Sequence, residues 1–338
     1  MKTILVTGAG GLVATQLICQ LLEKKNSYRI IALSTHPDVL KERYKEVAEV
    51  QITDMDHLST TNEVQIDVCI HAAFSRNKNA ADIASSLQFT SEILKFCKNQ
   101  NVPLFVNISS QSVYGQITSP LWTEQAIPSP DYLYAMGKYS TEVLTETAFY
   151  KTSIKHTNIR LSSVSENARF LNVFVKNAIE GKPIVIQGGT QQVSFIDVRD
   201  VAAALIKLIE KGMTIDLKPV YNLGTGKTRT ILQLANDVKR IFKSDYGKNV
   251  TVEVQPSDLV LDVGMNPQLF ENTFDWHPVY DYDDMIISLI LLNNNQLPPP
   301  TALLKNPNTE YTRTTLKDRW KMPSSYAIVY KHQQYQEL

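Results

Sequence analysis

The stretch 132–138 reads YLYAMGK and places Tyr134 four residues before Lys138. Residues i and i+4 of a helix share one face, so the ammonium could lie beside the phenol. A phenol has an ordinary pKa of about 10, so acid/base work near neutrality needs a fall of roughly three units, or about 4 kcal/mol. One ammonium at about 4 Å and an effective dielectric of ~20 supplies a similar amount. The alternative is an amphipathic packing tyrosine, so the pair needs a cofactor site and a proton-relay partner elsewhere.

A glycine pattern near the N-terminus predicts a dinucleotide site. The segment TGAGGLVATQL follows a strand-like run and opens a helix-like one, which is the context that the dinucleotide fingerprint requires. Gly8 would permit a tight turn, Gly11 would let the backbone approach the pyrophosphate, and Ala14 is small enough for close packing. The N–H groups and dipole at the helix start favour a diphosphate. The predicted cofactor contacts of this loop are Gly8, Gly11, Leu12 and Val13.

The second strand-like run ends without the carboxylate that usually accepts from the ribose 2′-hydroxyl of NAD. Ser34 and Thr35 stand there, and no acid appears until Asp38. Their hydroxyls could donate to a 2′-phosphate, and Arg43 or Lys41 could reach it. We therefore favour NADP, with NAD open; in the alternative interpretation these residues simply end a strand. Three further predicted cofactor contacts are Ile52, Ala72 and Ala73.

Strand-like and helix-like runs alternate through the first half of the chain. Apolar strand-like runs occupy 4–7, 29–33, 67–70, 104–109 and 156–162, and helix-like stretches occupy 12–25, 38–47, 80–99 and 131–150. This alternation predicts right-handed crossovers and an α/β fold with a Rossmann-type doubly wound parallel sheet.

The regular alternation of strand-like and helix-like runs ends at about residue 165. After it, short strand-like runs at 183–186, 193–198 and 250–254 are mixed with helix-like stretches at 199–211 and 230–243. We expect a smaller C-terminal α/β substrate lobe there. The predicted parts are 1–165, mainly the dinucleotide-binding domain with the catalytic residues, 166–292, mainly the substrate lobe with some segments returning to the sheet, and 293–338, a linker plus C-terminal extension.

Composition argues against several other classes of protein. Lysine and arginine total 34, as do aspartate and glutamate, so nothing favours bulk attraction to nucleic acid or acidic membranes. The histidines lack metal-ligand spacing, so no structural zinc is expected. Three scattered cysteines fit reduced thiols in a cytoplasm. The chain opens with strand-like MKTILVTG and has no run of about 18 apolar residues, so neither a cleavable signal nor a membrane span is expected.

In order and spacing, the motifs resemble the extended short-chain dehydrogenase/reductase superfamily, in its NAD(P)-dependent epimerase/dehydratase branch. The resemblance covers about residues 1–292. Besides the glycine loop and the Tyr134–Lys138 spacing, it includes HAA (71–73), SQSVYG (110–115), VSFIDVRDVAAAL (193–205), YNLGTGKTRTILQLA (221–235) and DWHP (275–278). Each motif alone is loose, but together they are specific.

The family pattern implies a catalytic hydroxyl three residues before the valine of VYG, which falls on Ser110. The resemblance then implies that Ser110 hydrogen-bonds the substrate oxygen that Tyr134 protonates or deprotonates, while Lys138 also bridges to the nicotinamide ribose. Extended members mostly act on nucleotide-diphosphate sugars, so the implied activity is a 4-keto-sugar reductase or a 4-epimerase of a sugar nucleotide. Two alternatives stay open: a reductase of a non-nucleotide carbonyl compound and a non-catalytic NAD(P)-binding sensor.

Two departures from the family pattern narrow the reaction. Related dehydratases carry adjacent acids after the catalytic hydroxyl, whereas this chain has Gln111 and Ser112, so a 4,6-dehydratase is disfavoured. The arginine that many relatives use on the diphosphate is Val193 here, which removes a charge-assisted contact.

Relatives commonly pair through two long helices, here about 80–99 and 131–150, so a homodimer is expected. The second of these stretches carries more apolar residues than one sheet contact requires. The C-terminal extension starts with NNNQLPPP and then carries aromatic residues among lysines and arginines. It is either a flexible appendage or a segment that packs back on the protein and replaces the charge lost at Val193.

Overall fold

The computed structural model describes residues 1–24, 26–45, 47–60, 65–76, 79–115 and 121–293. The chain folds as two compact units. The first contains 1–162, 198–226 and 264–278, and the second contains 163–197, 227–263 and, within the described residues, 279–293. Segments of the C-terminal half therefore return to the first unit, and each unit is described by itself.

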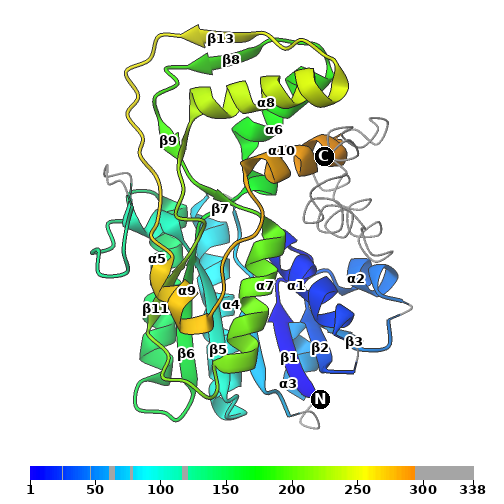
Figure 1. Cartoon of the computed structure of the whole chain (residues 1–338). Coiled ribbons are helices and arrows are strands. Elements are labelled where there is room, and N and C mark those ends of the chain that lie inside the picture. The colour runs from blue at the N-terminus through cyan, green and yellow to red at the C-terminus, as the bar shows by residue number, and fades with distance from the viewer. Residues whose placement is uncertain (25, 46, 61–64, 77–78, 116–120, 294–338) are drawn as a thin grey trace. The chain divides into compact units, whose positions relative to one another are not determined.

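Seven parallel strands form the sheet of the first unit within the described residues, in the order β11-β6-β5-β4-β1-β2-β3 (Figure 1). The strands are β1 (Lys2–Thr7), β2 (Tyr28–Leu33), β3 (Val50–Thr53), β4 (Val68–His71), β5 (Leu104–Ser110), β6 (Lys155–Leu161) and β11 (Val220–Leu223). The helices of this unit are α1 (Leu12–Glu23), α2 (Pro37–Arg43), α3 (Met55–Thr60), α4 (Ala80–Asn99), η1 (Gln111–Tyr114), α5 (Leu133–Phe149), α7 (Val198–Lys211) and α9 (Gln268–Phe274). The chain order reverses between β1 and β4, which is the switch point of a doubly wound sheet.

Helices cover both faces of this sheet. Leu5 of β1 and Phe105 of β5 belong to one cluster with Ile93 of α4 and Phe149 of α5. The neighbouring strand residue Ile4 is fully buried too, as expected where helices lie on each side. Helix α4 packs on α5 and α1 packs on α7, and the latter pair lies in front of the sheet in Figure 1. The predicted Rossmann-type doubly wound parallel sheet is confirmed.

The second unit is a small α/β assembly. Its strands are β7 (Ser163–Val164), β8 (Ile184–Gln187), β9 (Gln192–Val193), β10 (Phe195–Ile196), β12 (Arg229–Thr230) and β13 (Val252–Gln255), and its helices are η2 (Ser165–Asn167), α6 (Arg169–Ile179), α8 (Ile231–Tyr246) and α10 (Tyr282–Asn293). The pairs β8–β13 and β7–β10 are parallel, and β9–β12 is antiparallel. The core between the helices includes Leu171, Phe174, Leu234, Phe242 and Ile286.

Several local predictions differ from the structure: besides the two cases below, β11 and the helices α3, α6, α9 and α10 were not among the predicted elements. The run 193–198, predicted as one strand, divides into β9 and β10, and α7 already begins at Val198. The division has a physical reason, since β9 pairs with β12 and β10 pairs with β7. Strand β3 was not among the predicted strands; its residues favour a strand, but it is only four residues long and lies at the sheet edge, so no long apolar run marks it.

The C-terminal extension lies outside the described residues from position 294, so both interpretations of it stay predictions. Among the residues that the structure does describe, no helix combines the length and apolar character needed to cross a membrane.

Candidate active site

The glycine loop closes tightly on the end of β4. Gly8 has a φ of +64°, and a Cβ atom added to it would lie 2.7 Å from the Cα of Ala73 and 2.8 Å from its nitrogen. The Ala73 N–H donates to the hydroxyl of Thr7 at 3.2 Å. Only glycine combines this backbone conformation with so close a neighbour. The structure therefore brings Gly8, Ala72 and Ala73 together at the carboxyl ends of β1 and β4.

Helix α1 begins at this loop with its N-terminal end uncapped by a side chain. Gly11 is the N-cap, it makes no side-chain cap hydrogen bond, and the first turn contains no acidic residue. The Gly11 N–H donates to the Gly8 carbonyl at 2.8 Å, which folds the loop back on itself. Leu12 and Val13 are half-buried in the first turn. A bare helix N-terminus beside a close-packed glycine turn has the shape and polarity that suit a diphosphate.

The ends of β2 and β3 hold the remaining predicted cofactor contacts. The N–H of Ser34 donates to the Thr53 carbonyl at 3.1 Å, and its hydroxyl accepts from the His36 N–H at 3.0 Å. Thr35 is exposed, and Ile52 is half-buried and pairs with Ala32 across the ladder. These residues line the same edge of the sheet as Gly8.

The two cations considered for a 2′-phosphate are engaged elsewhere. Arg43 is buried and donates to the hydroxyl of Thr15 on α1 at 3.0 Å. Lys41 pairs with Asp38 one turn away at 3.0 Å. The structure therefore does not bring a free cation from this pair to Ser34.

Ser110, Tyr134 and Lys138 come together at the end of β5. Ser110 is the last residue of β5 and the N-cap of η1, and its hydroxyl accepts from Ser112 N–H at 3.2 Å. Tyr134 and Lys138 lie one turn apart on α5, which packs on β5. Ser110 acts to lower the pKa of Tyr134 through its hydroxyl, so the two side chains lie near each other.

Lys138 is buried, and its ammonium donates to the backbone carbonyl of Ile108 at 2.7 Å. Its Nζ also lies 4.5 Å from the ring centre of Phe74. Burial lowers the pKa of Lys138 to about 7, and the carboxylate of Glu142 opposes this fall. The lysine is therefore balanced between its charged and neutral forms near neutrality.

The pKa of Tyr134 does not behave as the sequence led us to expect. Burial raises it above its ordinary value, while the charge of Arg76 and the hydrogen bond with Ser110 act in the opposite direction. The sequence argument treated the phenol as solvent-exposed and so omitted this desolvation cost. Lowering the pKa of Tyr134 to neutrality needs further positive charge beside the phenol.

Phe74 is a site residue that the sequence reasoning missed. Its ring meets that of Tyr134 edge-on at 5.8 Å and lies under the Lys138 ammonium. A Cβ atom added to Gly137 would come within 2.7 Å of the Phe74 ring, so glycine at that helical position makes room for it. The available signal was an aromatic residue directly after the two alanines that end the strand-like run.

In the second unit, Val193 is buried in β9 and pairs in register with Arg229 of β12. An arginine thus lies directly across the ladder from the position where the resemblance led us to look for one. The Arg229 guanidinium lies 5.1 Å from the ring centre of Tyr282, and its Nε is 3.8 Å from Asp237.

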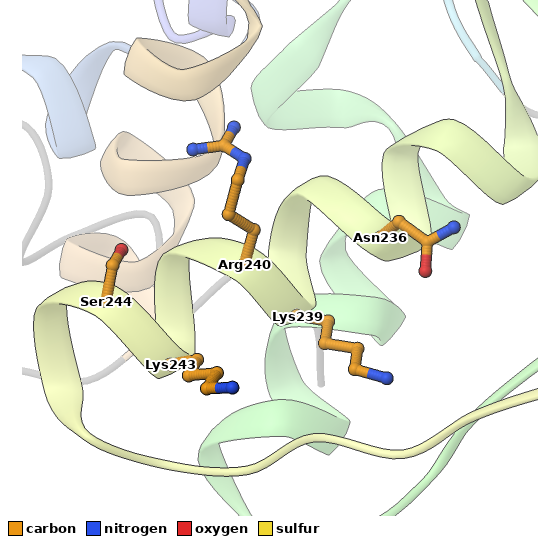
Figure 2. Close-up of a pocket in the computed structure, with 5 residues that line it drawn as sticks. All are labelled: Asn236, Lys239, Arg240, Lys243 and Ser244. Atoms are coloured by element: carbon orange, nitrogen blue, oxygen red, sulfur yellow. The ribbon is translucent and has the colours of Figure 1, made fainter.

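A hollow along α8 is shown in Figure 2 and is lined by Asn236, Lys239, Arg240, Lys243 and Ser244. Lys239 and Lys243 extend to one side of the helix and Arg240 to another. Arg240 forms ion pairs with Asp237 and Asp283. The hollow contains none of the predicted site residues.

Known proteins resemble this chain at low identity. A trifunctional UDP-glucose 4,6-dehydratase/UDP-4-keto-6-deoxy-D-glucose 3,5-epimerase/UDP-4-keto-L-rhamnose-reductase from Arabidopsis thaliana is 25% identical over 284 residues, which are 75% of this chain and 42% of that protein. The chain therefore spans less than half of that relative's length.

Two solved structures share the fold. The crystal structure of UDP-glucuronic acid 4-epimerase from Bacillus cereus in complex with NAD has a TM-score of 0.70 at 23% identity, covering 86% of this chain and 100% of that one. That of dTDP-glucose 4,6-dehydratase from Bacillus anthracis in complex with NAD has a TM-score of 0.72 at 20% identity, covering 86% and 96%. At these identities the likeness concerns the fold alone.

The sequence pattern of one family spans most of the chain. The model of the NAD dependent epimerase/dehydratase family matches residues 4–224, which include the glycine loop, Ser110 and the Tyr134–Lys138 pair. This chain belongs to the NAD dependent epimerase/dehydratase family.

Proposed function

We propose that this protein is a NAD-dependent 4-epimerase of a sugar nucleotide, which oxidises a secondary alcohol and reduces the resulting ketone from the other face. The observation that carries the proposal is that α5 places Tyr134 and the buried Lys138 one helical turn apart beside the end of β5, where Ser110 lies and where the Ile108 carbonyl accepts from Lys138. These groups stand at the same sheet edge as the Gly8 turn.

The residues of the glycine loop fit a dinucleotide. Gly8 leaves space that a Cβ atom would fill, and the bare N-terminus of α1 begins at Gly11. We propose that this loop holds the diphosphate, that Ser34 and Ile52 lie along the adenosine half, and that Ala72 and Ala73 lie along the backbone of the cofactor. When bound, the nicotinamide supplies a reversible acceptor and donor of hydride.

NAD is the cofactor that we propose, because Arg43 and Lys41 are engaged with Thr15 and Asp38. The family is itself described as NAD dependent. The preference for NADP that the hydroxyls of Ser34 and Thr35 suggested stays a prediction, and a titration decides it.

The chain's own residues account for the proton transfer. Ser110 donates a hydrogen bond to the reacting substrate oxygen, and Tyr134 removes the proton from that oxygen or returns it. The pKa of Lys138 is about 7, so part of the protein carries the ammonium at neutral pH, and we propose that this ammonium stabilises the phenolate of Tyr134 during the reaction. Phe74 packs against both groups and helps to hold their side chains in place.

Two positions support a reaction without elimination of water. Gln111 accepts from the Ser162 hydroxyl at 3.3 Å, and the Ser112 hydroxyl donates to that of Ser110 at 3.0 Å. Neither side chain is a carboxylic acid, so neither can deliver the proton that departing water needs. A 4-keto-sugar reductase is the second candidate, and the hydroxyls of Ser34 and Thr35 are the feature that favours it.

Arg229 supports a diphosphate-bearing substrate. It lies across the ladder from Val193, and we propose that its guanidinium replaces the missing charge on that diphosphate. Arg229→Gln should then raise KM for the sugar nucleotide about tenfold or more and leave kcat nearly unchanged. The matched control is Arg240→Gln on the exposed surface of α8, for which KM should not change.

We also propose a homodimer that pairs through α4 and α5. Leu133, Met136 and Val143 of α5 are 45%, 47% and 48% exposed and recur at helical spacing, so they form an apolar stripe. Light scattering at micromolar concentration should give twice the 38.1 kDa of one chain. A single-chain mass would refute this part.

The reaction is tested with purified protein, NAD and a panel of UDP- and dTDP-sugars. A 4-epimerase interconverts two sugar nucleotides without net formation of NADH, whereas a reductase consumes NADH or NADPH once per product. Cofactor binding without turnover of any sugar nucleotide or other carbonyl substrate would instead support a non-catalytic sensor.

A further inference from the structure

Helix α5 carries a third charged residue on the face that bears Tyr134 and Lys138. Glu142 follows Lys138 by four residues, is 3% exposed, and continues the same line along the helix. A carboxylate this deeply buried is costly unless it is paired and hydrogen-bonded.

Glu142 meets both requirements through neighbouring strands. Arg160 of β6 donates to it from Nε at 3.0 Å and from a terminal nitrogen at 2.8 Å, in a two-pronged contact. The hydroxyl of Ser109 donates to the same carboxylate. Ser109 immediately precedes Ser110, so one carboxylate connects α5, β6 and the strand end that presents the catalytic hydroxyl.

The ammonium of Lys138 is hydrogen-bonded to β5, the strand that contains Ser109. It donates to the Ile108 carbonyl, one residue before Ser109. The groups of β5 that bond Lys138 and Glu142 are therefore a carbonyl and a hydroxyl, and neither carries charge. A negatively charged partner of the Lys138 ammonium must therefore lie on an element other than β5.

We infer that Glu142 is a positioning residue for the proposed reaction: it fixes the register of α5 on β5 and β6 and supplies the negative charge that keeps Lys138 an ammonium. The inference rests on the proposed role of Tyr134 and Lys138. Glu142 touches no reacting atom and acts only through its neighbours.

The other titratable groups around Lys138 do not supply this charge. Tyr134 lies on the same helix, and burial raises its pKa, so the phenol is neutral at pH 7. His71 of β4 is also neutral, because burial and the charge of Lys138 lower its pKa to about 3. Arg76, after β4, is a cation near Tyr134. Arg160 of β6 is a cation already paired with Glu142.

The direction of the pH effect follows from the charges. Burial holds the pKa of Lys138 near 7, and Glu142 raises it against that burial. Without the carboxylate, the pKa should fall further, by about one unit. The ammonium would then be lost at lower pH, and the pH range that supports turnover would move to lower pH.

The experiment is an NMR titration of protein labelled with ¹³C at lysine Cε, with Lys138→Arg used to assign the signal. Glu142→Gln should lower the midpoint of the Lys138 signal by about one pH unit. The matched control is Glu146→Gln, one turn further along α5, where the carboxylate bonds His156 and Asn158 instead. That variant should leave the midpoint unchanged.

A second variant is needed in case Glu142→Gln does not fold, because this substitution leaves Arg160 buried without its partner. The double variant Glu142→Gln/Arg160→Met removes both charges and should also lower the midpoint. An unchanged Lys138 midpoint in the folded single or double variant overturns the inference.

The titration needs no substrate, so its outcome is separate from that of the proposed function. Wild-type protein that turns over no sugar nucleotide would refute the proposed function while the Lys138 midpoint still shifts. If turnover is found, its pH profile should shift in Glu142→Gln by the same amount as the NMR midpoint. A loss of rate at all pH values without a shift would mean that Glu142 has only a structural role, and would contradict the inference.

Discussion

A Cβ atom added to Gly8 would lie 2.7 Å from the Cα of Ala73, so the end of β1 and the end of β4 touch through a residue that has no side chain. Backbone atoms make the contact on the Ala73 side, and they cannot move away as a flexible side chain could. The contact places the loop that we propose for the diphosphate directly beside the alanines that follow β4.

Gly8→Ala should therefore abolish dinucleotide binding and lower the free energy of unfolding. The positive φ alone costs roughly 1–3 kcal/mol, and the backbone clash adds a comparable amount. Gly247 is the matched control, because it has the same φ of +64° and nothing within 4 Å of an added Cβ atom. Urea denaturation and cofactor titration should show a smaller loss of stability in Gly247→Ala and unchanged binding. Equal losses in both variants would contradict the role of the Gly8–Ala73 contact.

Tyr134→Phe should reduce turnover by about 10²–10⁴-fold, because the variant keeps the ring but loses the proton that the reaction transfers. The edge-on contact with Phe74 should survive, so cofactor affinity should stay nearly the same. Steady-state kinetics and a binding titration measure the two quantities. Tyr132→Phe is the control, since that tyrosine lies 38% exposed at the helix N-cap. Near-normal turnover in Tyr134→Phe would remove this residue from the mechanism.

The residues at the end of β2 lead to a prediction of how the protein distinguishes NAD from NADP. Ser34→Asp should weaken NADP binding at least about tenfold, because the carboxylate repels the 2′-phosphate, and should leave NAD binding equal or tighter. Arg43→Met should lower stability, since Arg43 is buried against Thr15, but should not change the ratio of the two affinities. Fluorescence titrations with both cofactors measure these ratios. A selective loss of NADP binding in Arg43→Met would show that this arginine reaches the phosphate after all.

Gly137→Ala should destabilise the protein although alanine favours helices. The gain in helix propensity is at most about 1 kcal/mol, whereas overpacking costs roughly 1–3 kcal/mol. The added methyl group would lie 2.7 Å from the Phe74 ring and 2.9 Å from Ile83. Because that ring also contacts Tyr134 and Lys138, turnover should fall as well. Phe74→Leu in the same chain should restore the lost stability; a Gly137→Ala protein that melts at a higher temperature would contradict this packing argument.

Because of His71, we expect the free energy of unfolding to fall at acidic pH. Its pKa lies near 3 in the folded chain against an ordinary value of 6.5, so the unfolded chain binds the extra proton between these values. The neutral His71 side chain makes its full contribution to the free energy of unfolding above pH 6.5. This contribution is lost as the pH falls toward 3, by up to about 1.4 kcal/mol per pH unit. Denaturant titrations from pH 7.5 to pH 4.5 measure the slope. It should become smaller in His71→Gln and stay the same in His57→Gln, whose side chain is 81% exposed; equal slopes in all three proteins would exclude His71 as the cause.

The local sequence was sufficient to predict the fold class, five of the seven strands of the sheet and the residues proposed for the site. Apolar runs separated by helical periodicity indicate crossovers whose handedness follows from strand twist, so β1, β2, β4, β5 and β6 could be expected from the residues alone. Gly8 and Gly11 could be assigned because a positive φ and a bare helix start are local properties of a strand–turn–helix segment. The spacing of Tyr134 and Lys138 is likewise local, since one helical turn sets it.

Only the tertiary structure decided what surrounds these residues. The end of β4 brings Phe74 between Tyr134 and Lys138, and β6 brings Arg160 to Glu142; both contacts join residues far apart in the chain. Burial depends on every element that packs around a group, which is why the pKa of Tyr134 rises although its helical neighbour is a lysine. In the same way, packing against α1 holds Arg43 on the hydroxyl of Thr15, a contact that the local sequence did not predict.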